Sequence, residues 1–383
     1  MSTVSKIEWT DRTWNPVRGC SIVSRGCVNC YAMTQAHRFG GMYRANGIDG
    51  AYTVPGPFHG LTKQTSAGPQ WTGQIRTVRE ALFEPLSWKE PARVFVNSMS
   101  DLFHEEVPDQ FIVDVFGVMA LAHWHTFQVL TKRPERMRSF LCAGDHGIIQ
   151  QFQAIERNGG VGPKGLFRAL DIKRRDGVEW NWPLPNVWLG VSAEDQQRAD
   201  ERIPLLLQTP AAVRFVSAEP LLGPIKFQRR QLGVRTDCDG CRVLDVRVDE
   251  DGCCQSCGRD ALSYGLDWVI VGGESGPGAR RCNVGWIRSI VQQCHAASVP
   301  CFVKQLGSVV IDRNDAGFMG EWPEAWPDTI DQEDRVEHDL DGARDGYQGA
   351  PVRIYLKDRK GGKPDEWPED LRVRQFPVSG GRA

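Results

Sequence analysis

Six short runs of apolar residues recur along the chain, and each run ends in polar residues or glycine. The runs are continuously apolar and do not alternate with polar positions, a pattern typical of strands that are buried on both faces, as in a parallel sheet. They predict strands at 93–98, 126–131, 186–192, 212–217, 267–272 and 300–304.

Segments with helical patterning lie between these runs and predict helices at 108–122, 134–142, 194–207 and 284–298. Pro134 stands where a first helical residue is expected. Ser192 is followed by Glu194, as in a helix whose cap precedes an acidic first turn. Repeated βα units predict a parallel α/β sheet, either open or closed into a barrel.

Polar and charged residues follow the predicted strands. In parallel α/β folds, the site lies at the C-terminal ends of the strands. We therefore expect functional side chains within the segments 97–101, 131–133, 192–194, 217–219 and 272–275.

Three segments interrupt the repeat, and we expect them to be additions to a core made of 1–227 and 266–305. The abundance of Gly, Pro and Thr predicts a long loop at 40–75. The other two are a mixed insertion at 143–185 and a Cys-rich insertion at 228–265.

The C-terminal part, 306–383, is rich in Asp, Gly, Trp and Pro. This composition predicts an irregular extension. We expect it to pack on the core through its aromatic side chains, namely Trp322, Trp326, Trp367 and Phe376.

Composition and charge indicate which class of protein this is. The 383 residues have a formal net charge of -2 and include 12 Cys. There is no apolar run of the length that a membrane span needs, and the N-terminus lacks a secretory signal. We expect a cytoplasmic protein with reduced thiols, whose cysteines serve metal binding or catalysis. Any nucleic acid would bind through a local basic groove, since the chain is not basic overall.

Three cysteines, Cys20, Cys27 and Cys30, are spaced C-x6-C-x2-C near the N-terminus. Three thiolates can hold three irons of a [4Fe-4S] cluster and leave the fourth iron without a protein ligand. A zinc site with His37 as fourth ligand is the alternative. Gly19 allows the tight turn that such a loop requires.

A second cysteine group has the spacing C-x2-C-x12-C-x2-C, which is similar to a zinc ribbon. Its predicted zinc ligands are Cys238, Cys241, Cys254 and Cys257, with Cys253 as an alternative to Cys254. The insertion is either a zinc-dependent structural element or, given the arginines around it, a contact for nucleic acid or a protein partner. A second iron–sulfur cluster is a third possibility.

Several motifs resemble the radical S-adenosylmethionine (radical SAM) superfamily, whose usual cysteine spacing is C-x3-C-x2-C. The closest resemblance is to the spore photoproduct lyase-like branch, and it rests on Cys27–Tyr31, Ser98–Asp101, Leu130–Pro134, Val187–Ser192 and Glu219–Pro220. The whole chain also resembles a phage- and prophage-associated three-Cys family of unknown function. Its pieces are Ile7–Asp11, Trp14–Pro16, Gly272–Arg280 and Trp367–Val373.

The resemblance implies a partial (β/α)6-type barrel and an enzyme that uses a [4Fe-4S] cluster to cleave SAM reductively to a 5′-deoxyadenosyl radical. It also implies an electron donor such as flavodoxin or ferredoxin. Cys20, Cys27 and Cys30 would be the cluster ligands.

The resemblance also assigns roles to residues at the strand ends. Ser98, Ser100 and Asp101 would accept hydrogen bonds from the SAM ammonium group, and Lys132 or Arg133 would pair with its carboxylate. Ser192 and Glu194 would hold the ribose. Helix capping and a solvated helix start are the structural alternatives for these residues. The catalytic candidates are Glu219, Glu274 and Arg280.

The predicted substrate is a nucleic acid or nucleotide, because basic residues follow the predicted strand at 126–131 and a ribbon-like insertion is present. These basic residues are Lys132, Arg133, Arg136 and Arg138. A non-redox zinc-binding protein that binds nucleic acid or a protein partner is the alternative. A metal-dependent barrel hydrolase ranks last, since His123 and His125 form the only close histidine pair and precede a strand.

Overall fold

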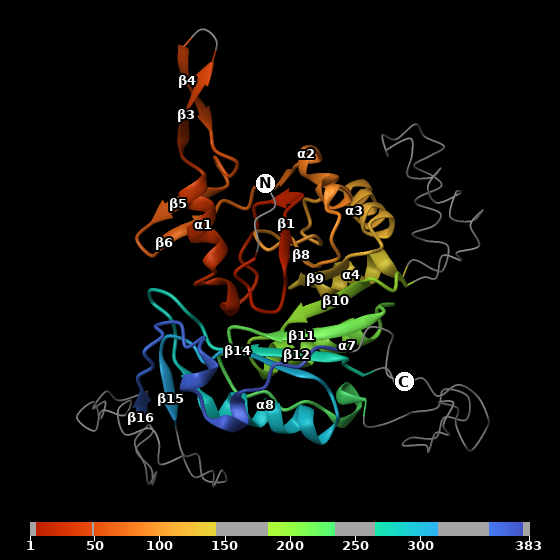
Figure 1. Cartoon of the computed structure of the whole chain (residues 1–383), viewed down its shortest axis with the longest axis vertical. Coiled ribbons are helices and arrows are strands. Elements are labelled where there is room, and N and C mark those ends of the chain that lie inside the picture. Colours follow the sequence, from red (N-terminus) through yellow and green to blue (C-terminus); the bar gives the residue numbers. More distant parts are fainter. Residues whose placement is uncertain (1–4, 48–49, 143–182, 234–264, 313–351, 378–383) are drawn as a thin grey trace, which may run out of the picture. The chain divides into compact units, whose positions relative to one another are not determined.

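The computed structural model describes residues 5–47, 50–142, 183–233, 265–312 and 352–377 (Figure 1). The chain forms two compact units. The first is made of Met1–Val191 and Pro204–Arg214, and the second of Ser192–Ile203 and Phe215–Arg382. Among the described residues, helices capable of crossing a membrane are absent.

Parallel strands form the centre of the first unit. β8 pairs with β1 on one side and with β9 on the other, and β9 also pairs with β10. All three pairings are parallel, and the side chains of β10 are buried along its whole length. The strands are β1 (Arg12–Trp14), β8 (Arg93–Val96), β9 (Thr126–Thr131) and β10 (Val187–Ser192).

Three helices of the first unit follow from local sequence. α3 is buried from Phe111 to Ala120, as its nearly continuous apolar run requires. α4 begins at Pro134, the residue expected at its start. The bounds are α2 (Arg79–Leu82), α3 (Asp109–Leu121) and α4 (Pro134–Leu141).

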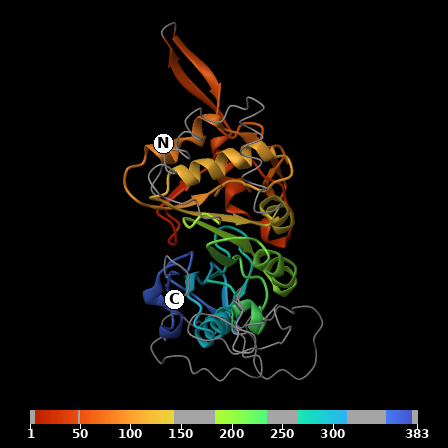
Figure 2. The ribbon, with the colours of Figure 1, turned by 90° about the vertical axis from the view of Figure 1, so that its right-hand side faces the viewer.

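The predicted loop at 40–75 is wrong, since this segment forms two antiparallel hairpins, β3–β4 and β5–β6. Its glycines lie at the turns, where Gly68 has a φ of 100° and pairs with Thr65, and its threonines favour strands. Figure 1 and Figure 2 both show β3–β4 extending away from α1. The bounds are α1 (Tyr31–Phe39), β3 (Met42–Gly47), β4 (Gly50–Pro55), β5 (Thr62–Thr65) and β6 (Gly68–Trp71).

The second unit contains a parallel array in which β12 pairs with β11 and with β14. Helix α8 follows β12, and its first turn is capped by Asn283, whose side chain accepts a hydrogen bond from the Gly285 amide. The bounds are β11 (Val213–Ala218), β12 (Trp268–Gly272), α8 (Val284–Ala296) and β14 (Cys301–Gln305). α7 (Gln196–Leu207) is divided between the two units.

Aromatic side chains in the described part of the C-terminal extension pack against strands of this second unit. Trp367 is fully buried, and the ring of Phe376 lies 5.4 Å from that of Trp268 and 5.2 Å from that of Phe302. Trp322 and Trp326 lie outside the described residues. The extension also contributes to a small sheet made of β13 (Cys282–Asn283), β15 (Val310–Asp312) and β16 (Val352–Ile354).

The α/β fold class is confirmed. The parallel strands follow the order β1-β8-β9-β10-β11-β12-β14 and form an all-parallel sheet of the half-barrel type. Each of the six predicted strands and four predicted helices is present. The prediction missed β1, which is short and contains the polar residues Arg12 and Thr13. Most of the predicted insertions at 143–185 and 228–265 lies outside the described residues.

Candidate cysteine-loop site

The three-cysteine segment connects β2 (Val17–Arg18) to α1, which begins directly after Cys30. Gly19 fixes its start. Gly19 has a φ of 91°, and a Cβ there would lie 2.2 Å from the carbonyl oxygen of Gln74. Gly19 also forms a parallel bridge to Ser100, just beyond β8. The loop therefore begins against the C-terminal end of a sheet strand, where the sequence placed the site.

The thiols of Cys20, Cys27 and Cys30 are free and partly buried. Burial raises the pKa of Cys20 to about 12, and the charge of Asp101 adds to this effect. Burial also raises the pKa of Cys30, whereas Lys132 lowers it. The charges of Cys27 and Cys30 raise the pKa of Cys20 further, and the charge of Cys27 raises the pKa of Cys30, because each thiolate would lie in the field of a neighbour. Ionising Cys20 and Cys30 together requires compensating positive charge.

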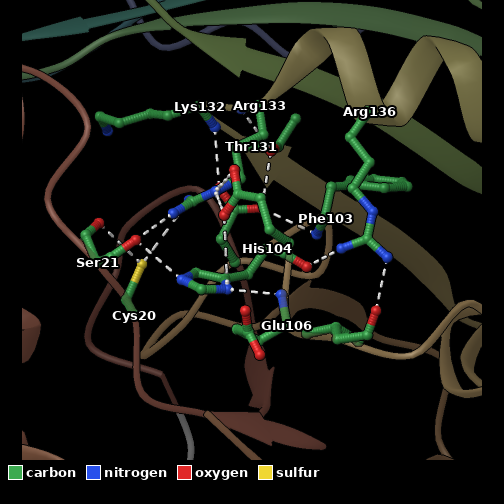
Figure 3. A network of polar contacts seen from close by, with 12 residues as sticks. Cys20, Ser21, Phe103, His104, Glu106, Thr131, Lys132, Arg133 and Arg136 are labelled. Atoms are coloured by element: carbon green, nitrogen blue, oxygen red, sulfur yellow. Dashed lines mark hydrogen bonds and ion pairs between the residues drawn. The ribbon is translucent and has the colours of Figure 1, made fainter. Parts of the chain in front are cut away.

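Arg133 connects this loop to the sheet (Figure 3). Its Nη1 donates to Asp101 Oδ2 at 3.1 Å, its Nε to Glu105 at 2.9 Å, and its Nη2 to Ser21 Oγ at 2.7 Å. The same Nη1 lies 4.0 Å from Cys20 Sγ. Burial opposes the charge on Arg133, yet Asp101 and the other acidic neighbours raise its pKa above the ordinary value. Arg133 is therefore a permanent cation beside Cys20.

Asp101 is the partner that makes this buried cation tolerable. Its side chain is also buried, and it accepts hydrogen bonds from Thr131 Oγ1 at 2.8 Å and from the Lys132 amide at 3.1 Å. A further bond from the Phe103 amide closes the turn after β8. The carboxylate thus joins the end of β8 to the end of β9. These contacts fix the turn after β8, and the predicted contact of Asp101 with SAM stays a prediction.

Ser21 and His104 complete the network, and no sequence pattern indicates either of them. His104 Nδ1 accepts a hydrogen bond from the Glu106 amide, so Nε2 carries the proton and donates to Ser21 Oγ at 2.9 Å. Burial and the charge of Arg133 lower the pKa of His104, which keeps the ring neutral. Ser21 therefore receives two donors, and this fixes the residue directly after Cys20.

The structure separates the basic residues that were predicted together. Arg136 donates to the carbonyl oxygens of His104 and Val107 and pairs with Asp109, so it holds a turn. Lys132 is partly exposed, and its positive charge lowers the pKa of Cys30. Lys132 thus keeps its side chain partly open to solvent, whereas the guanidinium of Arg133 is held by Asp101, Glu105 and Ser21.

The hydroxyls of Ser98 and Ser100 have neighbours of their own. Ser98 Oγ donates to Asn15 Oδ1 at 3.2 Å, and Ser100 Oγ donates to the Val17 carbonyl at 2.7 Å. These bonds tie β8 to the segment before the cysteine loop. Their hydroxyl oxygens retain acceptor capacity, and the predicted role toward the SAM ammonium group stays a prediction.

Carboxylate–cation pairs occupy the strand ends of the second unit. Glu194 is fully buried and pairs with Arg202 at 3.0 Å, while Ser192 accepts from Arg202 through its backbone carbonyl. The two catalytic candidates Glu274 and Arg280 pair with each other at 2.5 Å. No sequence pattern indicates Arg202, because it lies ten positions after Ser192 and only the turn into α7 brings the two together.

Glu219, the third catalytic candidate, also has a cation partner. Its Oε1 lies 3.2 Å from Lys304 Nζ, and its Oε2 accepts from Ser217 Oγ at 3.3 Å. Gly272 lies against this pair, since a Cβ there would approach Glu219 Oε1 to 2.8 Å. The sequence analysis missed Lys304, the fourth residue of β14.

The predicted zinc ligands Cys238, Cys241, Cys254 and Cys257 lie outside the described residues. Within those residues, His, Cys, Asp and Glu side chains nowhere converge in threes on a position for a single metal ion. His37 Nδ1 instead lies 3.2 Å from Thr62 Oγ1. This contact gives the His37 zinc alternative no support.

The comparisons with known proteins give one match. A family model described as a protein of unknown function (DUF5131) matches residues 4–350. The chain has no significant match among curated proteins. The solved structures give none either.

Asp101→Ala is expected to lower the free energy of unfolding by about 3–5 kcal/mol, because it removes the buried carboxylate that faces Arg133 and leaves it only the exposed carboxylate of Glu105. Urea denaturation measures this loss. The matched control is Asp11→Ala, which breaks the exposed pair with Arg93 and is expected to cost less than about 1 kcal/mol. Equal losses in the two variants would contradict the role given to the buried pair.

Gly273→Ala is expected to destabilise the chain by about 1–3 kcal/mol, because the new Cβ would lie 2.1 Å from the Leu306 carbonyl oxygen. Gly41→Ala is the control, since a Cβ at Gly41 meets nothing within 4 Å. Thermal unfolding of both variants checks the difference. A Gly273→Ala protein as stable as the control would show that the close approach of the Leu306 carbonyl does not require glycine at position 273.

Proposed function

The chain belongs to the DUF5131 family of proteins of unknown function, and we propose that it is a radical SAM enzyme with its cluster at the cysteine loop. The observation that carries the proposal is the Arg133–Asp101 pair, which fixes a loop with three free thiols to the C-terminal ends of β8 and β9. The parallel α/β fold is compatible with this chemistry.

The residues present fit a [4Fe-4S] cluster. Cys20, Cys27 and Cys30 would hold three irons, and such ligands serve separate irons and do not converge on one ion. The pKa values of Cys20 and Cys30 are raised, so thiolates at these two positions need compensating positive charge. Arg133 and Lys132 are the nearby cations, and cluster irons would complete the balance. When bound, the cluster supplies the electron for reductive cleavage of the S–C5′ bond of SAM.

The chain's own residues would position this cofactor and its substrate. Lys132 would pair with the carboxylate of SAM, while Arg133 would hold Cys20 in place and offset its charge. Asp101, Ser98 and Ser100 would fix the strand end that faces the loop. In this assignment Arg133 changes from a carboxylate ligand to a positioning residue, because its hydrogen bonds go to Asp101, Glu105 and Ser21.

Three further roles stay proposals of the same account. Ser192 and Glu194 would bind the ribose hydroxyls of SAM, and Arg202 would hold Glu194 in position. Glu219 and the Glu274–Arg280 pair would act on the substrate. A small acidic electron donor of the flavodoxin or ferredoxin kind would reduce the cluster, and the substrate would be a nucleic acid or nucleotide.

Anaerobic reconstitution with iron and sulfide tests the proposal. We expect about four irons in the cysteine loop of the unaltered chain, and 5′-deoxyadenosine after dithionite and SAM are added. Cys27→Ala is expected to lose these irons and the product. Cys142→Ala, which changes an exposed cysteine outside the loop, is expected to keep both.

The opposite result is equally clear. A colourless chain that binds zinc without iron and forms no 5′-deoxyadenosine would reject the radical SAM proposal. It would favour the non-redox zinc-binding protein instead. The metal content and the product are separate readouts, so an inactive chain that has its iron is distinguished from one that never formed a cluster.

A further inference from the structure

The segment around the cysteine loop is basic, although the chain as a whole has a formal net charge of -2. Between residues 12 and 78 the sequence contains seven Lys and Arg, against a single acidic residue, Asp49. This segment includes the loop, α1 and both hairpins. A local positive region in a chain of balanced charge indicates an anionic partner.

Two arginines in this segment are held together in an unfavourable arrangement. In the antiparallel pair of β2 with β7 (Arg76–Thr77), Arg18 lies directly opposite Arg76. Both guanidinium groups donate to the Pro57 carbonyl oxygen, at 3.5 Å and 3.3 Å. Like charges opposite each other on neighbouring strands are destabilising. Burial and the charge of Arg76 together lower the pKa of Arg18.

Neither arginine has an ion pair with a carboxylate in the part of the chain that the structure describes. Arg76 is exposed and Arg18 is partly exposed. This differs from Arg133 and Arg136, whose charges are matched by Asp101 and Asp109. Glu84 and Glu80 act on Arg18 through their charges without forming an ion pair with it, and Arg76 also donates to the His59 carbonyl oxygen. The pair therefore keeps positive charge that an anionic ligand can meet.

We propose that Arg18 and Arg76 bind a phosphate of a single-stranded nucleic acid, and that α1 and the two hairpins bind the rest of the strand. This proposal rests on the proposed function and names the substrate class of the proposed enzyme. Two guanidinium groups that converge on one point match the oxygens of a phosphodiester. The bound phosphate would remove the repulsion between them.

The neighbouring surface has the composition that single strands require. Arg38, Arg44 and Lys63 are exposed on α1, β3 and β5. The side chain of Phe39 is 43% exposed and that of Tyr43 is 41% exposed. The Arg38 guanidinium lies 6.0 Å from the centre of the Phe39 ring. Basic residues that follow a backbone, with aromatic rings on which bases stack, are typical of single-strand binding.

The phosphate pair also lies beside the proposed chemistry. Arg18 is followed directly by Gly19, which forms a bridge to Ser100, and then by Cys20. A strand bound at Arg18 and Arg76 would therefore pass the cysteine loop. The projecting β3–β4 hairpin, visible in Figure 1, extends the same surface away from α1.

Fluorescence anisotropy of the full chain with labelled oligo(dT) and oligo(rU) tests this proposal before any iron is added. The Arg18→Gln/Arg76→Gln double variant is expected to bind about tenfold more weakly near physiological salt. The slope of log affinity against log salt is expected to fall by about 0.7, the value for one lost phosphate contact on a single strand. Lys89→Gln, which removes an exposed charge outside the segment, is expected to match the unaltered chain.

The Arg18→Lys/Arg76→Lys variant is expected to keep most of the salt slope, because it keeps both charges. Equal weakening by the glutamine pair and by Lys89→Gln would overturn the proposal, as would a lysine pair that loses as much slope as the glutamine pair. Tighter binding of duplex DNA than of either oligonucleotide would also overturn it. Cys27→Ala is expected to bind oligonucleotide normally, so a failure of the radical SAM proposal and a failure of this one are distinguishable.

Discussion

The buried ion pair between Arg133 and Asp101 is the interaction on which the candidate site depends. It joins the ends of β8 and β9, and through Ser21 and Cys20 it fixes the beginning of the cysteine loop. A buried pair of this kind gains little stability over apolar packing, but losing one partner is costly. Together with the Gly19–Ser100 bridge and the hydrogen bonds of Ser21 to His104 and of Tyr31 to the Ser98 carbonyl, it sets the position of the loop.

The sequence predicted the central fold because its signals are local. Continuous apolar runs gave the six long strands, and Pro134 marked the start of α4. The hairpins at 40–75 were missed because glycine and proline signal both a loop and the turns of short strands. β1 was missed because a three-residue strand has no pattern to detect.

The candidate site was only partly predictable for a similar reason. The cysteines and the strand-end polar residues are visible in the sequence, since the parallel sheet brings strand ends to one edge. Their partners are not visible, because Arg202, Lys304 and His104 meet the predicted residues only after folding. The opposed arginines Arg18 and Arg76 likewise depend on a two-residue strand pairing that no sequence pattern indicates.

Electron paramagnetic resonance of the reduced, reconstituted chain tests the central claim most directly, namely that the cysteine loop holds a cluster with one iron left open for SAM. The account predicts a [4Fe-4S] signal that changes shape when SAM is added, because SAM would bind that iron. It also predicts that Cys27→Ala lacks the signal. A cluster signal that SAM leaves unchanged, or one that survives in Cys27→Ala, would contradict the account.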